Sequence, residues 1–520
     1  MNNVETQVHR HRLEGIASEM GSVLQQTAFS PNIKERRDFS CAIVDKGGNL
    51  VAQAAHIPVH LGAIPIIMNS FLDQVDPEPG KGYLMNDPYS GGTHLPDLSY
   101  VEPWIPGEKI EGFVINRAHH TDIGGEQAGS MAASSHIDQE GFRTDPRIIS
   151  EDRELKRTQI EDLLEQSRTP KQRVTDLEAQ ISAACRGRER LTNWASKLAE
   201  SSDQLFDRLF SYSRKFLKNL ITEIDSFQST AVDYLDGDGF GRERIPIRVR
   251  LDIDSNTIVA DFTNSADQVE GNVNCPRSVT ASATYYVIQT LLGSDVAVNQ
   301  GVLSPVEIQT REGSILDAEY PAAVAGGNVE TSQRIVDVLL KAFAGCFPKK
   351  VPAASQGTMN NVTLGWSDSE EKKTYYETLG GGAGGGPEHN GLSGRQVHMT
   401  NTLNTPIEEF ERSFPILIEA LKLRSNSGGQ GLNRGGEGIV KRWRALRKIS
   451  VGLLTERRTI PPYGLQNGEK GRTGKNVVLN NSGEQTEISS KENCELQPGE
   501  ALEMHTPGGG GWGDERTEDS

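Results

Sequence analysis

The spacing of hydrophobic residues changes along the chain and predicts a succession of different elements. Over residues 5–28 apolar positions recur every three or four residues, as on one face of an amphipathic helix. Residues 42–45 and 50–53 are short apolar runs joined by a glycine-rich turn, which predicts a β-hairpin. Residues 112–115 are another apolar run and predict a further strand. The first part of the chain therefore combines one long helix with a sheet.

Helical and strand-like patterns separate in the middle of the chain. Residues 151–165 and 174–227 carry apolar residues at helical spacing between charged ones, which predicts a helical hairpin or small bundle. Residues 232–320 alternate short apolar runs with turns, as in antiparallel β-structure. Cys275 precedes an apolar helix predicted for 279–292. There it could either have a lowered pKa or be a buried structural thiol.

Glycine dominates the last 200 residues, in runs such as 380–386 and 427–431. Gly326 and Gly327 precede a helix predicted to reach Phe343, whose first amides could hold an anion. None of these runs has the strand–GxGxxG–helix setting of a dinucleotide site. We therefore interpret them as places where chain segments pass close to one another.

Charge and composition narrow the class of protein. A formal net charge of -17 argues against nucleic-acid binding through a basic face. No apolar run approaches the roughly 18 residues of a membrane span, and the N-terminal sequence has no signal-peptide pattern. The five cysteines lie far apart without metal or redox spacing. We therefore expect a reduced, cytoplasmic protein.

Two short runs, 86–97 and 116–125, are rich in histidine, aspartate and glycine. The prolines and glycines of the first run predict an irregular loop that aims its side chains. His94 and Asp97 are three residues apart, a spacing that can bring both side chains to one point. Imidazole and carboxylate together suit zinc, manganese or iron(II). The runs therefore predict a divalent-metal site, although a single His-x-x-Asp pair is more often only a hydrogen-bonded loop.

His119 and His120 directly follow the strand predicted at 112–115. Neighbouring residues on a strand point to opposite faces. Only one of the pair is therefore expected to bind metal. The other either faces the substrate or serves as an internal hydrogen-bond partner.

Charged and histidine residues also flank the predicted hairpin. The cluster at 34–38 is either a solvated turn or a group of side chains paired and aimed at a site. His56 and His60 are four residues apart, but Pro58 between them argues against a shared helical metal-binding face.

Together these patterns predict an α+β protein of several domains, with mixed sheets, a helical insertion and a glycine-rich C-terminal half. At 520 residues the chain is too long for a single core. The predicted units are a metal-site domain, a helical hairpin or bundle, a β-rich domain and a glycine-rich α+β domain. Their boundaries are placed at 1–150, 151–230, 231–320 and 321–520.

Several motifs together resemble the hydantoinase B/oxoprolinase family, and the resemblance runs nearly end to end. The motifs that carry it are Glu35-Arg36-Arg37-Asp38-Phe39-Ser40, His56-Ile57-Pro58-Val59-His60-Leu61-Gly62, Asn86-Asp87-Pro88-Tyr89 with His94-Leu95-Pro96-Asp97, His119-His120-Thr121-Asp122-Ile123-Gly124-Gly125, Gly326-Gly327-Asn328 and Thr506-Pro507-Gly508-Gly509-Gly510-Gly511-Trp512-Gly513. The family supplies B (beta) subunits of ATP-dependent hydantoinases, 5-oxoprolinases and caprolactamase. It is also similar to a large subunit of acetone and acetophenone carboxylases.

The resemblance implies a division of labour between two subunits. A partner A (alpha) ATPase subunit of the hydantoinase A/oxoprolinase type would bind ATP and Mg, and this chain would hold a divalent metal (Zn, Mn or Fe). In agreement, the chain contains no GxxxxGK[ST] phosphate loop. His120 or Asp122 would transfer the proton beside the metal. The metal ligands carried over from the family are Asp38, His94, Asp97 and His119.

The function that the resemblance implies is ATP-dependent ring opening of a cyclic amide such as hydantoin, N-methylhydantoin, 5-oxoproline or a lactam. The metal would polarise the activated carbon or deliver hydroxide. Two other functions fit the family: a subunit of an acetone- or acetophenone-type carboxylase, and a non-catalytic scaffold for the ATPase subunit. We expect a hetero-oligomer, with neither nucleic acid nor membrane as a partner.

Overall fold

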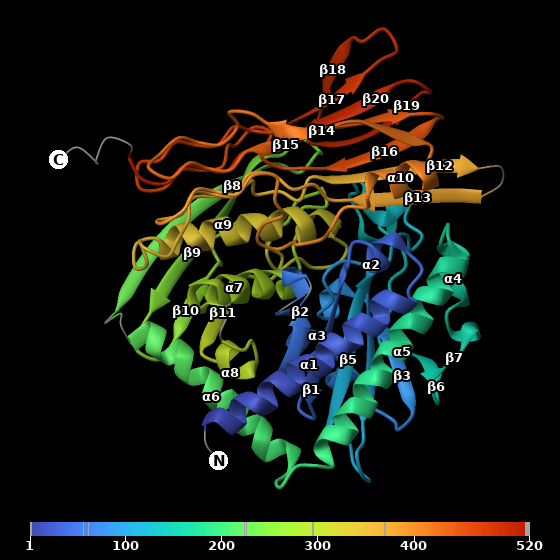
Figure 1. Ribbon diagram of the computed structural model, residues 1–520, viewed down its shortest axis with the longest axis vertical. Coiled ribbons are helices and arrows are strands. Elements are labelled where there is room, and N and C mark those ends of the chain that lie inside the picture. The colour runs from blue at the N-terminus through green and yellow to red at the C-terminus, as the bar shows by residue number, and fades with distance from the viewer. Residues whose placement is uncertain are drawn as a thin grey trace.

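The computed structural model describes residues 3–55, 57–60, 62–222, 224, 226–293, 296–368 and 371–514. In this part of the chain four β-sheets pack with helices, and the predicted α+β class is confirmed (Figure 1). None of the described helices combines the length and the apolar character needed to cross a membrane. The helices are α1 (Asn3–Thr27), α2 (Pro31–Lys34), α3 (Ala63–Gln74), α4 (Glu161–Gln166), α5 (Pro170–Ala195), α6 (Ser202–Thr222), α7 (Arg277–Leu292), α8 (Gln300–Leu303), α9 (Ser332–Phe343) and α10 (Ile407–Ser413).

A seven-stranded antiparallel sheet organises the first part of the chain, in the order β2-β1-β5-β4-β3-β6-β7. Helices α1 and α5 cover one face and α3 covers the other. Val114 packs toward α1 and α5, whereas the next residue, Ile115, packs toward α3, because side chains alternate along a strand. The strands are β1 (Phe39–Asp45), β2 (Leu50–Ala55), β3 (Lys81–Met85), β4 (Asp97–Trp104), β5 (Gly112–His119), β6 (Arg147–Glu151) and β7 (Glu154–Leu155).

This part of the fold confirms the long helix, the hairpin and the strand that the hydrophobic pattern predicts, as α1, β1–β2 and β5. The helices predicted for 151–165 and 174–227 are present only in part, as α4, α5 and α6. The helical prediction is wrong at 154–155, because these residues pair with β6 as strand β7, and at Phe227, where a strand begins. Helix α5 contributes to the core of the seven-stranded sheet, whereas the end of α6 packs in the next core. The domain boundaries themselves stay a prediction.

A second sheet of four strands follows, in the order β11-β10-β9-β8, with α7 and α9 packed in the same core. Its pairs are antiparallel, as predicted, except that β10 and β11 run parallel. Cys275 lies just before α7, and burial raises the pKa of its thiol to about 12. It is therefore the buried structural thiol of the two alternatives. The strands are β8 (Phe227–Gly237), β9 (Glu243–Ile253), β10 (Ile258–Asp261) and β11 (Val306–Gln309).

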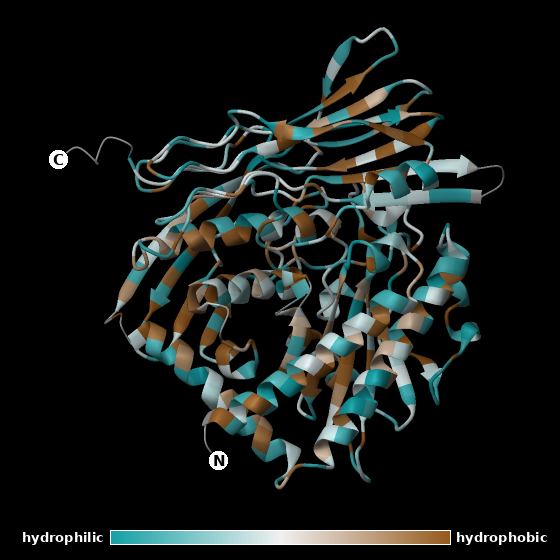
Figure 2. Cartoon of the chain, in the orientation of Figure 1, coloured by the Kyte–Doolittle hydropathy of each residue, from teal (hydrophilic) through white to brown (hydrophobic). Residues whose placement is uncertain are grey.

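Two further sheets pack around one core, in the orders β13-β12-β16-β19 and β14-β15-β20-β17-β18. They lie at the top of Figure 1, above both earlier sheets. The residues of their shared core are apolar, and hydrophobic and hydrophilic positions both occur along these strands (Figure 2). The strands are β12 (Asn361–Asp368), β13 (Glu371–Glu377), β14 (Ile416–Arg424), β15 (Gly438–Ala445), β16 (Ile449–Leu454), β17 (Lys475–Leu479), β18 (Gln485–Ile488), β19 (Lys491–Leu496) and β20 (Ala501–His505).

The glycine-rich segments join these sheets and hydrogen-bond to each other through their backbones. Gly509 N donates to Gly436 O at 2.9 Å, and Gly436 N donates to Ala383 O at 2.8 Å. A Cβ atom added at Gly436 would lie 2.0 Å from Leu392 O, where no side chain fits. Close passage of segments, as interpreted from the sequence, is therefore the role of these glycines.

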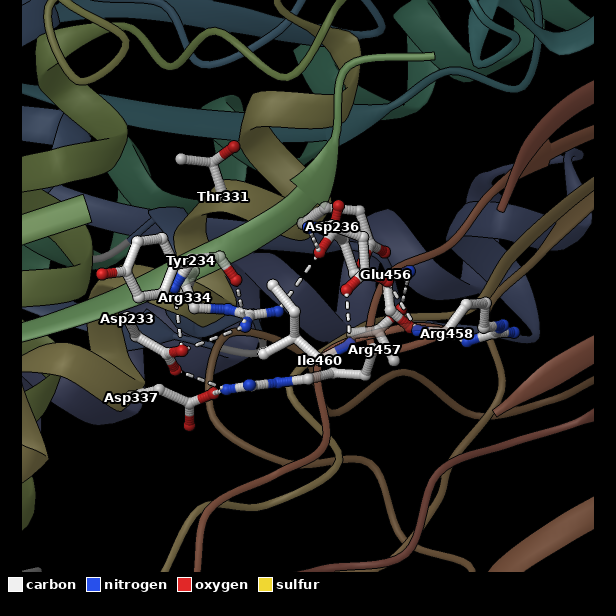
Figure 3. A network of polar contacts seen from close by, with 12 residues as sticks. Asp233, Tyr234, Asp236, Thr331, Arg334, Asp337, Glu456, Arg457, Arg458 and Ile460 are labelled. Atoms are coloured by element: carbon white, nitrogen blue, oxygen red, sulfur yellow. Dashed lines mark hydrogen bonds and ion pairs between the residues drawn. The ribbon is translucent and has the colours of Figure 1, made fainter. Parts of the chain in front are cut away.

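A buried network of charged side chains ties β8 and α9 to the segment 455–460 (Figure 3). Arg457 pairs with Asp233, at 2.7 Å, and with Asp337. Arg334 pairs with Glu456 at 3.2 Å, and Lys491 of β19 reaches the same carboxylate at 2.6 Å. Segments far apart in sequence are thus held by paired charges rather than by apolar contacts alone.

Candidate metal centre

The two histidine-rich runs meet at one edge of the seven-stranded sheet. Asp97 opens β4 and His119 ends β5, and the antiparallel register places these two residues directly opposite each other. His94 lies in the loop that leads into β4, and Asp97 N donates to His94 O at 3.1 Å. Strand pairing therefore brings both runs to one point.

Three atoms of these residues form a small triangle. His94 Nε2 lies 3.1 Å and His119 Nδ1 3.3 Å from Asp97 Oδ1, and the two ring nitrogens are 3.2 Å apart. All three side chains are buried, and Asp97 Oδ1 accepts no hydrogen bond from any described residue. Ligand atoms about 2.0–2.2 Å from one ion are about 3.0–3.5 Å apart at tetrahedral or octahedral angles. The triangle therefore fits one face of the coordination sphere of a divalent cation.

The other oxygen of Asp97 is fixed by two neighbours. Thr93 Oγ1 donates to Asp97 Oδ2 at 2.5 Å, and His60 Nε2 lies 3.2 Å from the same oxygen. His60 Nδ1 lies 3.0 Å from Ser40 Oγ on β1, so the imidazole is held at both ends. Burial would raise the pKa of Asp97, but His94 and His60 hold it well below its usual range. The carboxylate is therefore ionised, as a metal ligand has to be.

Packing against an aromatic ring fixes the orientation of His119. Its ring stacks on Tyr376 of β13, with centroids 5.1 Å apart and an interplanar angle of 14°. Burial lowers the pKa of His119, which favours the neutral imidazole that binds metals. Tyr376 thus sets the plane of a candidate ligand.

The triangle borders a cavity of about 20 Å³, which is room for a single ion or water molecule. Asp38 lines this cavity but is not part of the three-residue cluster, so its role as a ligand stays a prediction. Arg36 is fully buried beside it and donates to Tyr376 O at 2.9 Å and to Thr378 Oγ1 at 3.2 Å. Of the charged cluster at 34–38, Arg36 and Asp38 are therefore aimed at the site, whereas Lys34 and Arg37 are exposed, as in a solvated turn.

His120 and Asp122, the two predicted proton-transfer residues, lie elsewhere. His120 faces α5, where its Nε2 lies 2.9 Å from Gln180 Oε1, and burial lowers its pKa to about 3. Asp122 accepts hydrogen bonds from Gly124 N, Gly129 N and Arg168. Neither lines the cavity. His120 is the internal hydrogen-bond partner of the two alternatives, and a proton-transfer role for either residue stays a prediction.

The sequence does not predict the roles of several residues at the site. His60 lies in one of the motifs that resemble the family, but nothing in that motif indicates that its imidazole supports the Asp97 carboxylate. His56, in the same motif, lies outside the described residues. Asn328, Tyr376, Thr378 and Thr402 line the cavity from the C-terminal half of the chain. Only the folded structure shows that these segments reach the histidines.

An anion of the chain itself lies close to the anion site predicted at the start of the helix after Gly326. The buried carboxylate of Glu140 accepts hydrogen bonds from Val324 N and Ala325 N. Burial raises its pKa to about 7. A π-helical turn, Gly327–Thr331, then leads into α9 and places Asn328 at the cavity.

Comparisons with known proteins show chains of similar sequence and fold. The 5-oxoprolinase of Dictyostelium discoideum is 37% identical over 529 residues, covering 97% of this chain and 40% of that protein. The chain thus spans about two fifths of the length of this relative. The ATP-dependent caprolactamase of Pseudomonas jessenii has the same fold, with a TM-score of 0.90 and 22% identity over 99% of this chain and 91% of that one. An acetone carboxylase structure matches with a TM-score of 0.87 and 15% identity over 98% and 76%.

The sequence also matches the model of a protein family. The family model "Hydantoinase B/oxoprolinase" matches residues 2–515, which is almost the entire chain. The resemblance seen in the motifs is therefore confirmed. The chain belongs to the hydantoinase B/oxoprolinase family.

Proposed function

We propose that this chain is the B subunit of an ATP-dependent cyclic-amide hydrolase and that it holds a divalent metal ion. The observation that carries the proposal is the triangle of His94, Asp97 and His119, whose ligand atoms lie within 3.3 Å of one another. The 5-oxoprolinase relative supports cyclic-amide hydrolysis as the reaction class. A cyclic amide of the hydantoin, 5-oxoproline or lactam type is the substrate that we propose.

Each residue has a distinct task in this proposal. His94, Asp97 and His119 would hold the ion, with Asp38 as a further candidate at the same cavity. Such an ion supplies Lewis-acid activation of a carbonyl or phosphoryl oxygen. Thr93 and His60 orient Asp97, and Tyr376 orients His119. Burial of all three candidate ligands keeps bulk water from them.

ATP would be bound by a partner ATPase subunit rather than by this chain. The sequence has no GxxxxGK[ST] loop. The 5-oxoprolinase relative carries additional sequence equal to more than the length of this chain. We propose that a separate A subunit supplies the corresponding part here.

A carboxylase subunit is the second candidate, since an acetone carboxylase shares the fold. We favour the hydrolase because identity to the 5-oxoprolinase is 37%, against 15% to the carboxylase.

The proposal is tested by metal analysis and by reconstitution with an A subunit. Purified chain should contain close to one equivalent of zinc, manganese or iron. The reconstituted complex should consume ATP together with hydantoin, 5-oxoproline or caprolactam. Turnover of acetone with bicarbonate, without turnover of any cyclic amide, would favour the carboxylase. A chain that stays free of metal after these metals are supplied would contradict the metal site.

A further inference from the structure

A strongly basic groove lies on the surface beside β12 and β13. It consists of two adjoining hollows of about 630 and 640 Å³, which share Arg168, Trp366, Lys372 and Lys373. Two acidic residues, Glu126 and Glu495, line one hollow, and among its described lining residues the other has none. The basic residues of the groove are Arg168, Lys171, Lys372, Lys373, Arg447 and Lys448. Part of this charge is neutralised, because Arg168 pairs with Asp122 at 3.0 Å and Lys448 with Glu495 at 2.8 Å. In a chain with a net charge of -17, the remaining local excess of positive charge favours an acidic partner.

Aromatic side chains lie in the same groove. Phe29, just after α1, is 61% exposed, although a phenylalanine is usually buried. Trp366, which is buried, and Phe414 form an edge-to-face pair with ring centroids 5.3 Å apart, and both belong to the core beneath the groove. Aromatic residues surrounded by a charged rim are typical of protein interfaces. Phe29 therefore offers a contact for an apolar side chain beside the cations that would bind carboxylates.

The distribution of the cations suits an extended polypeptide better than a compact anion. They come from three separate places: the start of α5, strand β13 and the turn before β16. Lys171, Lys372 and Lys448 are exposed rather than buried around one point. A site for phosphate or a nucleotide instead directs several donors at one group.

The groove is connected to the candidate metal centre through Arg168. Arg168 Nη1 pairs with Asp122 Oδ2 at 3.0 Å, and its Nη2 donates to Gly125 O at 2.8 Å. Asp122 lies three residues after His119, so Arg168 fixes the loop that leaves the metal-site strand. A partner seated in the groove would contact this loop directly.

We propose that the basic groove is the docking site for an acidic segment of the partner ATPase subunit, with an apolar side chain of that segment against Phe29. This inference rests on the proposed function, which requires such a subunit. It adds where the partner subunit binds, the charge of the segment that binds there, and its contact with the loop that follows His119.

The test compares assembly of the A subunit with three forms of the full chain, by calorimetric titration at low salt and at about 1 M salt. The groove variant is Lys171→Glu/Lys372→Glu. The matched control is Lys215→Glu/Lys218→Glu, which makes the same charge change on exposed positions of α6. At low salt we expect the groove variant to bind at least about tenfold more weakly than wild type and control. The difference should shrink at about 1 M salt, where the Debye length is about 3 Å.

A second variant, Phe29→Ala, tests the apolar contact. It should weaken assembly at both salt concentrations, because salt does not screen apolar contacts. Metal content equal to wild type verifies that each variant is folded.

Each other outcome overturns the inference in a recognisable way. If the groove variant and Phe29→Ala assemble and turn over like wild type, the groove is not the docking site, while the proposed function stands. If the groove variant loses only binding of inorganic phosphate, or only self-association of this chain, the occupant is a small anion or a second copy. If no form of the chain assembles, the proposed function fails and the docking site fails with it.

Discussion

At the scale of single residues, the alternation of side chains along β5 separates two adjacent histidines. His119 points to the cavity and stacks on Tyr376, whereas His120 points to α5 and contacts Gln180. Asn116, on the same face as His120, donates to the Gln180 backbone at 2.9 Å. One residue of register thus decides which imidazole can reach a metal.

The two histidines should respond differently to substitution. We expect His119→Ala to lose the metal and His120→Ala to keep it. His120→Ala should instead lower the melting temperature, because Gln180 loses a buried partner. Metal content, melting temperature and turnover of the complex would be measured for both. A His120→Ala protein that is stable and metal-loaded but about 10²–10⁴-fold slower would support the proton-transfer role predicted from the sequence.

His60 should affect metal affinity without being part of the three-residue cluster. In His60→Ala, Asp97 Oδ2 keeps Thr93 but loses the imidazole that lies 3.2 Å away. Removing a group that orients a metal ligand weakens metal binding about 10–100-fold. Competition with a metal chelator would measure this loss, with the exposed His11→Ala as control. Equal affinities in the two variants would show that His60 has no orienting role.

At the scale of elements, close backbone contacts rather than side chains position the glycine-rich segments. Gly436→Ala should destabilise the protein by about 1–3 kcal/mol or more, because its Cβ would lie 2.0 Å from Leu392 O. Gly15, inside α1, has no atom within 4 Å of its added Cβ. Gly15→Ala should therefore stabilise by about 0.5–1 kcal/mol. Chemical denaturation measures the unfolding free energy of both variants. If both substitutions changed it in the same direction and by a similar amount, this interpretation of the glycines would be contradicted.

The elements with strong periodicity could be predicted from the sequence, and the contacts between distant elements could not. Helix α1, the β1–β2 hairpin and β5 follow from hydrophobic spacing within the segment itself. His94 and Asp97 could be named because they fall in an unusual loop, and His119 could be preferred to His120 because of the resemblance to the family. Tyr376 and His60 could not, since their roles depend on packing between segments far apart in sequence.

At the scale of the whole molecule, the buried charge network should be a major source of stability. Arg457→Met leaves Asp233 and Asp337 without the cation that they share. Breaking a buried pair from one side costs about 3–5 kcal/mol. Arg250→Met, which breaks an exposed pair with Asp252, should cost at most about 1 kcal/mol. Equal losses of unfolding free energy in the two variants would contradict a stabilising role for the network.

The same network gives stability a defined dependence on pH. Burial would raise the pKa of Asp233, but Arg457 and Arg334 outweigh it, so that the pKa is lowered. A carboxyl with a lowered folded-state pKa stabilises fully above its unfolded value of about 3.9. That stability is lost as the pH falls through the lowered value. The difference in unfolding free energy between wild type and Arg457→Met should thus be constant near neutrality and shrink in acid.

The chain alone should neither bind ATP tightly nor hydrolyse it, because it has no phosphate loop of the GxxxxGK[ST] type. Calorimetric titration of the isolated chain with ATP and Mg²⁺ measures this directly. Micromolar binding would contradict the division of labour between two subunits.

The cavity walls have a consequence for dissecting this protein. Arg36 and His119 come from the first quarter of the chain, yet they contact Tyr376 and Thr378 of the last third. A truncated protein ending near residue 320 would retain His94, Asp97 and His119. It would lack Tyr376 and Thr378, so the candidate ligands would be exposed to solvent. Shortened versions made for binding studies would therefore report on a different, open site. A split protein would regain the native one only if its two pieces reassociated around these contacts.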